Sequence, residues 1–551
     1  MVARPVTRLA RRFGRRPHRI VTRTLEGPAR SGSPSRDSSR DERRRFHDRE
    51  RGGEDLPWSW RAGLHKFIEG SATALGSIVV LGLAGYSYHA YYKAHVLRKM
   101  ENAFAVGYSS LELAALSRHI TPNSPHSNLA AIDFTDNDWV PRAEQATIDS
   151  IVDGTTQGQY HLITGEKGTG KTSMLLKAMS RIGGEGIALL EAHGDPEIFR
   201  VRLGKALDFE FHEDYVGSLL SFKGPRDTTA LLDIERAFDK MEKIALRRKE
   251  QIGKPLVLII TGAHLIRDDE DGQDLLELVQ QRAELWAASH LVTVVFVSDD
   301  YWTQERLMWQ ATRLRVTTVR DVPKTTALEA LRAFRADKFR EDVPSGFLEQ
   351  IYDKIGGRLS FLNRVAKSDD MVRACDAICE REKRWLLSHY WILGKDLDPG
   401  GETQQDLSSA AMLLAKALVD REDAMRRAGT GGRLPQIPIH EAQQIMTNAA
   451  WIKEHEHNNI FTIHSDGMVQ ADSVAMQHAM REICETPGFD EHLRATLDRL
   501  DEIESLQRTR EITLKDLRDN GEYRADVRKK TGDGMSDTGT VVSIRLEQAG
   551  S

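Results

Sequence analysis

Residues 160–181 read YHLITGEKGTGKTSMLLKAMSR, and this stretch decides which fold the chain can adopt. It opens with a short apolar run at 160–164. The next eight residues, 165–172, match the pattern G-x-x-x-x-G-K-[ST], and a helical pattern follows them directly. In such a loop the glycines let backbone N–H groups turn inward around a phosphate, at a helix N-terminus whose partial positive charge favours an anion. The stretch therefore predicts a strand, a phosphate-binding loop and a helix.

The loop predicts a nucleoside triphosphate site with ATP and Mg²⁺ as its cofactors. Lys171 should reach the β- and γ-phosphates, and Thr172 should ligate the Mg²⁺ ion. The candidate contacts within this stretch are Gly165, Gly168, Gly170, Lys171, Thr172 and Ser173.

Strand and helix patterns alternate around the loop from residue 139 onward. The further expected strands are 187–192, 256–261, 291–297 and 314–319. This alternation predicts an α/β P-loop domain with a five-stranded parallel sheet over residues 139–323. Residues 324–395 show helical periodicity only, and residues 403–486 read as helices followed by a β-hairpin. We therefore expect a helical lid and a C-terminal winged-helix domain.

The third strand ends without the acidic residue that usually helps to hold Mg²⁺. Residues 255–266 read PLVLIITGAHLI, and Thr261 and Gly262 occupy the strand end. Hydrolysis needs an acid at the metal and commonly a second carboxylate that polarises the attacking water. Neither Thr nor Gly supplies a negative charge, so the sequence predicts nucleotide binding with weak or absent hydrolysis.

Other residues could replace the missing acid. The run 268–271 is acidic but lies past the strand end, in an expected solvated loop. Asp299 and Asp300 end the next strand, where one of them could act on Mg²⁺ through water, with Ser298 sensing the γ-phosphate. The alternative is that both aspartates cap the following helix. His264 could position water, although a lone histidine after a strand is usually structural.

The order of phosphate loop, five-stranded core, helical lid and winged helix resembles the AAA+ class, in particular its origin-recognition and STAND-like branch. The resemblance implies that Pro141 and Arg142, in the box WVPR at 139–142, lie near the adenine. It also implies that Arg358, in the segment GGRLSFLNRVAK at 356–367, contacts the γ-phosphate.

Two further arginines have a counterpart in such families. Arg306 and Arg313 fall between the fourth and fifth strands, where those families carry the arginine that reaches a neighbouring subunit's nucleotide. An ordinary surface arginine is the alternative for each. Under the first interpretation the chain would form a homo-oligomer. More narrowly, residues 139–486 look like a group of fungal mitochondrial AAA-type proteins with a C-terminal winged helix.

The N-terminal segment differs in charge from the rest of the chain. Residues 1–52 carry 16 Arg and 6 acidic residues, a net charge of +10, whereas the whole chain has a net charge of −5. The first 25 residues hold eight Arg and no acid, which is typical of a mitochondrial presequence. A basic nucleic-acid-binding arm is the alternative. We expect a presequence and a disordered linker over residues 1–56.

Residues 70–92, GSATALGSIVVLGLAGYSYHAYY, contain no Lys, Arg, Asp or Glu. Their length predicts a transmembrane helix, with a buried core helix as the alternative. A presequence followed by a single span predicts a single-pass protein of the mitochondrial inner membrane. The flanking basic residues are balanced, so the side that holds the soluble domain stays open.

The winged-helix segment carries little of the charge that nucleic acid needs. Its candidate second and third helices, at 439–459, hold one lysine against three glutamates. A face of this kind would repel a phosphate backbone, so we expect it to bind a protein partner or to pack against the lid rather than to bind nucleic acid. An amphipathic helix is expected at 487–518, followed by a disordered tail at 519–551.

Together these features predict a membrane-anchored, AAA+-like protein whose bound ATP acts as a conformational and assembly switch. Two alternatives belong to other classes. One is an active ATPase that remodels membrane proteins or mitochondrial nucleoids, which needs an acid from Asp299 or Asp300. The other is a nucleic-acid-binding maintenance protein that acts through its winged helix.

Overall fold

The computed structural model describes residues 59–107, 140–211, 229–391, 402–429 and 432–510. The predicted presequence and linker at 1–56 and the predicted tail at 519–551 lie outside the described residues.

A five-stranded parallel sheet forms the centre of the first large domain, as predicted. Its strands are β1 (Tyr160–Thr164), β2 (Ile187–Glu191), β3 (Leu256–Thr261), β4 (Val292–Val297) and β5 (Leu314–Thr318). They lie in the order β2-β3-β4-β1-β5, and every neighbouring pair is parallel. Because helices cover both faces of a parallel sheet, its central strands are almost continuously apolar and buried.

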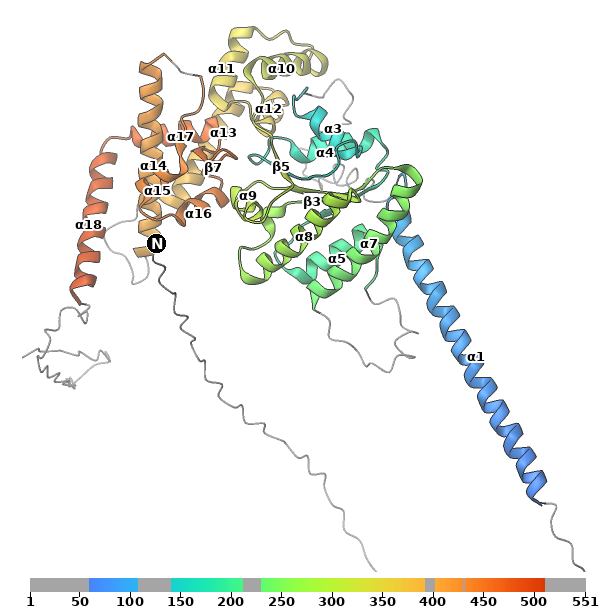
Figure 1. The fold of residues 1–551 in the computed structure, drawn as a ribbon. Coiled ribbons are helices and arrows are strands. Elements are labelled where there is room, and N and C mark those ends of the chain that lie inside the picture. Colours follow the sequence, from blue (N-terminus) through green and yellow to red (C-terminus); the bar gives the residue numbers. More distant parts are fainter. Residues whose placement is uncertain (1–58, 108–139, 212–228, 392–401, 430–431, 511–551) are drawn as a thin grey trace, which may run out of the picture. The chain divides into compact units, whose positions relative to one another are not determined.

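Helices cover this sheet on two sides (Figure 1). The core helices are α3 (Gln145–Val152), α4 (Lys171–Arg181), α5 (Pro196–Ala206), α7 (Ala230–Ile252), α8 (Glu270–Ser289) and α9 (Tyr301–Met308). Buried side chains of α3 and α4 form one cluster with one face of the sheet. Buried side chains of α5, α7 and α8 form a larger cluster with the other face. The domain therefore has three layers, with the phosphate loop at the carboxyl end of β1.

The end of helix α1 (Ser59–Asn102) is part of the larger cluster, which the sequence pattern did not predict. Leu97, Met100 and Phe104 are buried there. The backbone N–H of Gly186 donates to the Phe104 carbonyl at 2.8 Å, which ties the segment to the start of β2.

The segment 70–92, predicted to be a transmembrane helix, lies inside α1. Among the residues whose side chains the structure describes, no helix has both the length and the hydropathy needed to cross a membrane. Residues 70, 73 and 74 of the predicted span lie outside the residues whose side chains are described.

The helical lid and the winged helix follow the sheet domain. The lid helices are α10 (Lys324–Lys338), α11 (Ser345–Ile355), α12 (Leu359–Ala366) and α13 (Met371–Tyr390). The winged-helix elements are α14 (Glu402–Arg427), β6 (Ile437–Pro438), α15 (Ile439–Met446), α16 (Trp451–His457), β7 (Phe461–Ile463), β8 (Met468–Ala471) and α17 (Val474–Cys484), followed by α18 (Phe489–Arg510). The antiparallel order β6-β8-β7 confirms the predicted hairpin.

The lid and the winged helix each bury side chains in the core of the other. Leu386 and Tyr390 at the end of α13 are buried in the winged-helix core. In return, Ala475 of α17 is buried in the lid cluster. A change in the position of the winged helix must therefore be transmitted to α13 of the lid.

Candidate functional site

The phosphate loop adopts a backbone that only glycine accommodates at key positions. Gly165 has φ +150°, and a Cβ atom there would lie 2.2 Å from the Val319 carbonyl oxygen. Gly170 has φ +98° and caps the N-terminus of α4. The loop thus curls between the ends of β1 and β5, with its backbone at a helix N-terminus, as an anion site requires.

Lys171, the first residue of α4, is buried and fully engaged. Its Nζ donates to the carbonyl oxygens of Gly165 at 2.7 Å and Glu166 at 2.9 Å. It also forms an ion pair with Asp299 Oδ1 at 2.8 Å. Thr172 and Ser173 follow in the first turn of α4. The loop lysine and the carboxylate that ends β4 are therefore direct neighbours, a contact that no sequence pattern could specify.

The end of β3 offers no carboxylate to this site. The Thr261 hydroxyl donates to the Leu190 carbonyl at 3.1 Å, and Gly262 turns the chain with φ +65°. His264 comes next, in the 3-10 helix η2 (Ala263–Leu265). Its Nδ1 accepts the backbone N–H of Asp299 at 3.1 Å. Asp299 is thus held between Lys171 and His264, and His264 has the structural role expected of a lone histidine.

In the acidic run after β3, Asp268 and Asp269 form hydrogen bonds at the start of α8. Asp269 caps α8 by accepting the Gly272 N–H at 2.9 Å, and Asp268 accepts from the Gln273 amide at 3.0 Å. These two aspartates therefore act at the start of α8, where negative charge favours the helix.

Asp300 points to a different partner from its neighbour Asp299. His457 Nδ1 of the winged helix lies 3.2 Å from Asp300 Oδ2. Asp300 is the N-cap residue of α9, but its side chain makes no capping hydrogen bond. Ser298 is fully buried, and its hydroxyl bonds to Thr303 at 3.1 Å. Of the two candidate acids, only Asp299 thus faces the phosphate loop in this structure.

Arg358 links the phosphate loop, the sheet domain and the winged helix. It precedes α12 and is 2% exposed. Its Nη1 donates to the Lys167 carbonyl of the loop at 2.8 Å and to Asp472 Oδ2 at 3.1 Å, and its Nε donates to Asp321 Oδ1 at 2.8 Å. Burial alone would lower the pKa of Arg358, but Asp472 and Asp321 together hold it above its usual range.

A second contact from the winged helix reaches the loop. His464, at the end of β7, places Nδ1 3.5 Å from Oε1 of Glu166. Both side chains are buried, and Glu166 Oε2 has no hydrogen-bond partner among the described residues. Burial raises the pKa of Glu166, and the negative charge of Asp321 adds to the effect. Sequence reasoning missed both residues, because Glu166 occupies a variable position of the loop pattern and His464 lies outside the pattern.

The winged helix also lies against α9 of the sheet domain. Glu456 Oε1 of α16 accepts the backbone N–H groups of Tyr301 at 3.0 Å and Ile463 at 3.3 Å. Burial, with Asp300 nearby, raises the pKa of Glu456. Lys453 forms an ion pair with Glu305 at 2.9 Å. The helix that was expected to contact a protein partner or the lid contacts the sheet domain of its own chain.

The residues expected near the adenine lie between the loop and the lid. Arg142 Nη1 donates to the Thr169 carbonyl at 3.4 Å, and Nη2 donates to the Arg320 carbonyl. Val140 packs against the lid cluster, whereas Pro141 between them is exposed.

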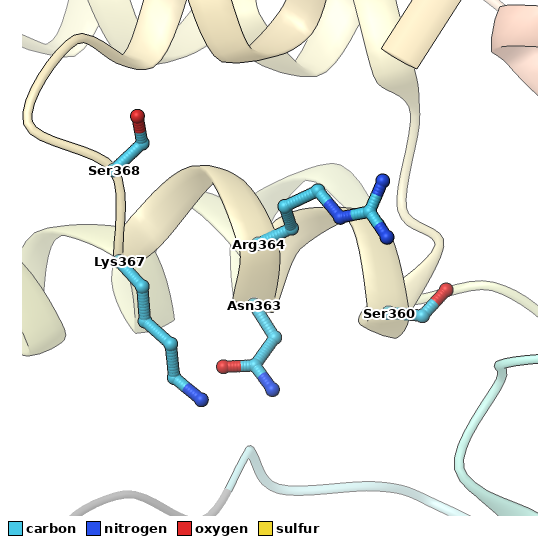
Figure 2. A pocket seen from close by; sticks show the side chains of 5 residues that line it. All are labelled: Ser360, Asn363, Arg364, Lys367 and Ser368. Atoms are coloured by element: carbon cyan, nitrogen blue, oxygen red, sulfur yellow. The ribbon is translucent and has the colours of Figure 1, made fainter. Parts of the chain in front are cut away.

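A pocket of about 390 Å³ borders the loop on the lid side. It is lined by Ser360, Asn363, Arg364, Lys367 and Ser368, from α12 and the turn after it. Figure 2 shows Asn363 and Lys367 pointing to the same side of α12. The backbone N–H of Ser360 donates to the Gly168 carbonyl at 3.1 Å, so the pocket adjoins the phosphate loop. Two of its lining residues, Arg364 and Lys367, carry cationic side chains.

Neither of the two arginines expected at a subunit boundary has a hydrogen bond or ion pair with the loop among the described residues. Arg306 bonds to Gln273 at 2.8 Å and stacks on Trp309, with its guanidinium 4.8 Å from the ring centre. Arg313 is exposed and directly precedes β5, at the end of the sheet opposite the phosphate loop. Neither side chain serves the nucleotide site of its own chain.

Comparison with known families gives two matches. Residues 139–295 match the AAA ATPase domain, and residues 388–504 match the C-terminal winged helix domain of fungal AAA proteins. Comparison with curated proteins gives no match.

Similar solved structures include three archaeal proteins. A Walker-type ATPase of Pyrococcus abyssi is 14% identical, with 62% of this chain and 96% of that chain covered and a TM-score of 0.42. Cdc6p of Pyrobaculum aerophilum is 12% identical, with 62% and 96% covered and a TM-score of 0.29. The Orc1 protein of Aeropyrum pernix, solved in complex with DNA, is 14% identical, with 63% and 93% covered and a TM-score of 0.31.

Proposed function

Because the chain joins an AAA ATPase domain to the C-terminal winged helix domain of fungal AAA proteins, we propose that it binds ATP as a conformational switch and hydrolyses it weakly or not at all. One observation carries this proposal. Arg358 touches the phosphate loop and the winged helix at once, through Lys167 and Asp472. An anion in the loop must therefore affect the same side chain that holds the winged helix.

The residues present fit a nucleoside triphosphate. The glycines give the loop its inward backbone, and Lys171 and Arg358 supply two buried cations at its edge. The nucleoside would lie near Arg142 and the lid residue Ser360, both of which donate hydrogen bonds to carbonyl oxygens of the loop. In the bound state Lys171 exchanges its loop carbonyls and Asp299 for phosphate oxygens.

Weak hydrolysis follows from the ligands available to Mg²⁺. The ion would neutralise charge on the β- and γ-phosphates when bound, and Thr172 would help to hold it. The end of β3 contributes Thr261 and Gly262, whose only side-chain oxygen bonds to Leu190. A metal held by fewer charged ligands polarises the attacking water less.

A second candidate function, an active ATPase, has one observation in its favour. Asp299 lies 2.8 Å from Lys171, so a carboxylate is present beside the phosphate loop although it comes from β4 rather than β3. If Asp299 replaces the acid missing from the end of β3 in holding Mg²⁺, the chain hydrolyses ATP. Asp300 does not share this role, because its carboxylate faces His457.

The two functions are separated by measuring binding and turnover on one preparation of the full chain. We expect Mg·ATP to bind in calorimetry and Lys171→Ala to abolish binding, because the variant loses the loop's cation. Turnover should not exceed that of Lys171→Ala. Turnover that Asp299→Asn removes would establish the active ATPase instead, and absence of ATP binding by the unmodified chain would refute both.

A mitochondrial location is part of the proposal and rests on the Arg-rich, acid-free residues 1–25. A fluorescent protein carrying residues 1–56 should enter mitochondria, and the full chain lacking these residues should not. Diffuse fluorescence of the fusion would favour the alternative of a basic nucleic-acid-binding arm.

A further inference from the structure

The side chain of Arg358 has almost no free hydrogen-bonding capacity. A guanidinium carries five N–H donors. Four are in use: one each to Asp321 Oδ1, the Lys167 carbonyl, Asp472 Oδ2 and the Asp472 carbonyl. Since a paired contact to a phosphate needs two donors in a fork, Arg358 cannot make it without releasing a present partner.

Asp472 is the partner whose release matters most for the position of the winged helix. It follows β8, it is 7% exposed, and its other carboxylate oxygen accepts from Thr462 at 3.3 Å. Asp321 and Lys167 belong to the sheet domain, as does the phosphate loop. Only the bonds to Asp472 cross from Arg358 to the winged helix.

We propose that Asp472 is a specificity-determining residue that lowers the chain's affinity for ATP relative to ADP, by competing with the terminal phosphate for Arg358. The inference rests on the proposed nucleotide function. The terminal phosphate of ATP is highly charged, and its free oxygens can accept two hydrogen bonds from one guanidinium. It can therefore take Arg358 from Asp472. ADP ends one phosphate earlier and leaves Asp472 paired.

The cost of taking Arg358 away is set by burial. A carboxylate that loses its cation inside the protein must be neutralised, rehydrated or moved. Rehydration of Asp472 requires the β7–β8 hairpin to leave the loop. The neighbouring contact between His464 and Glu166 favours the same outcome, because a triphosphate beside the buried Glu166 adds a further negative charge. Binding of ATP, but not of ADP, is therefore coupled to undocking of the hairpin, and the coupling is reciprocal.

The first test compares Mg·ATP and Mg·ADP affinities of the full chain by calorimetry. Asp472→Asn should raise the ATP/ADP affinity ratio by about tenfold or more, the range expected for weakening one buried hydrogen bond to a charged group. Asp466→Asn is the matched control. Asp466 lies in the same hairpin, accepts the Met468 backbone N–H at 3.3 Å and pairs with the exposed Arg320 at 3.5 Å, so the ratio should not change.

The second test remains informative if Asp472→Asn does not fold. The hydroxyl oxygens of Thr318 on β5 and Ser465 in the hairpin lie 2.7 Å apart. Replacing both residues, Thr318→Cys with Ser465→Cys, allows a disulfide that keeps the hairpin docked. The oxidised form should bind ADP like the unmodified chain and bind ATP at least tenfold more weakly. Reduction of the same sample, which is its own control, should restore ATP binding.

Three outcomes are distinguishable. A raised ratio in Asp472→Asn, or a loss of ATP binding that depends on the disulfide, supports the inference. Equal ATP/ADP ratios in a folded Asp472→Asn, the control and the disulfide-closed form would overturn it while leaving the proposed function intact. Absence of binding of either nucleotide by the unmodified chain would refute the proposed function and the inference with it.

Discussion

Replacing one buried histidine should change how the stability of the winged helix depends on pH. His455 of α16 has no exposed surface, and neither ring nitrogen has a hydrogen-bond partner among the described residues. Its ring contacts Tyr390 and Phe461 edge to face, at centroid distances of 4.6 and 5.9 Å. Phenylalanine has a similar shape, so His455→Phe should fit this site and remove the titrating group.

The size of the effect follows from the pKa of His455, which burial lowers from 6.5 to about 4. Because the folded-state pKa is the lower one, the unfolded chain takes up the proton first as the pH falls. Stability is therefore lost between about pH 6.5 and pH 4. One pKa unit corresponds to ~1.4 kcal/mol, so the loss from this residue is about 2 kcal/mol at pH 5 and about 3 kcal/mol near pH 4.

The assay is urea unfolding of the full chain at pH 7.5 and pH 5.0, with hydrogen exchange reporting on α16. The unmodified chain should lose about 2 kcal/mol more than His455→Phe over this interval. His161, buried on β1 with its pKa also lowered to about 4, contributes equally to both chains and cancels from the difference. His440→Phe, at an exposed position of the same domain, is the control. Equal losses in His455→Phe and the unmodified chain would refute the reasoning.

Three further predictions concern the nucleotide loop and the docked winged helix. Gly165→Ala should abolish ATP binding in calorimetry, because its Cβ would meet the Val319 carbonyl at 2.2 Å, whereas Gly346→Ala, where a Cβ meets nothing within 4 Å, should bind normally. Glu456→Ala should lower the free energy of unfolding by ~1–3 kcal/mol, because it strands two backbone N–H groups, while Glu456→Gln keeps the acceptor and most of the stability. The chain without the Arg-rich residues 1–56 should not retard duplex DNA in a gel at low salt, because Lys453 of the winged helix is paired within the protein; a salt-sensitive shift would contradict this.

The loop and the sheet were predictable from sequence because their signals are local. The glycines at 165, 168 and 170, together with Lys171, stand in a spacing that only a phosphate loop explains, and apolar runs mark each strand. The absence of charge at 70–92 predicted a membrane span, and among the residues whose side chains are described no helix is long and apolar enough to cross a membrane.

The sequence by itself determined the AAA-type sheet, the winged-helix hairpin, the position of the loop lysine and the missing acid at Thr261 and Gly262, since each depends on residues close together in the chain. Only the tertiary structure decided which of two adjacent aspartates faces the loop. Asp299 and Asp300 are the same residue type in the sequence, but Asp299 pairs with Lys171 and Asp300 with His457. The tertiary structure also decided that Arg358 is shared with Asp472, 114 residues away. This ion pair forms only when the domains pack and bury both charged groups, so no local pattern in the sequence predicts it.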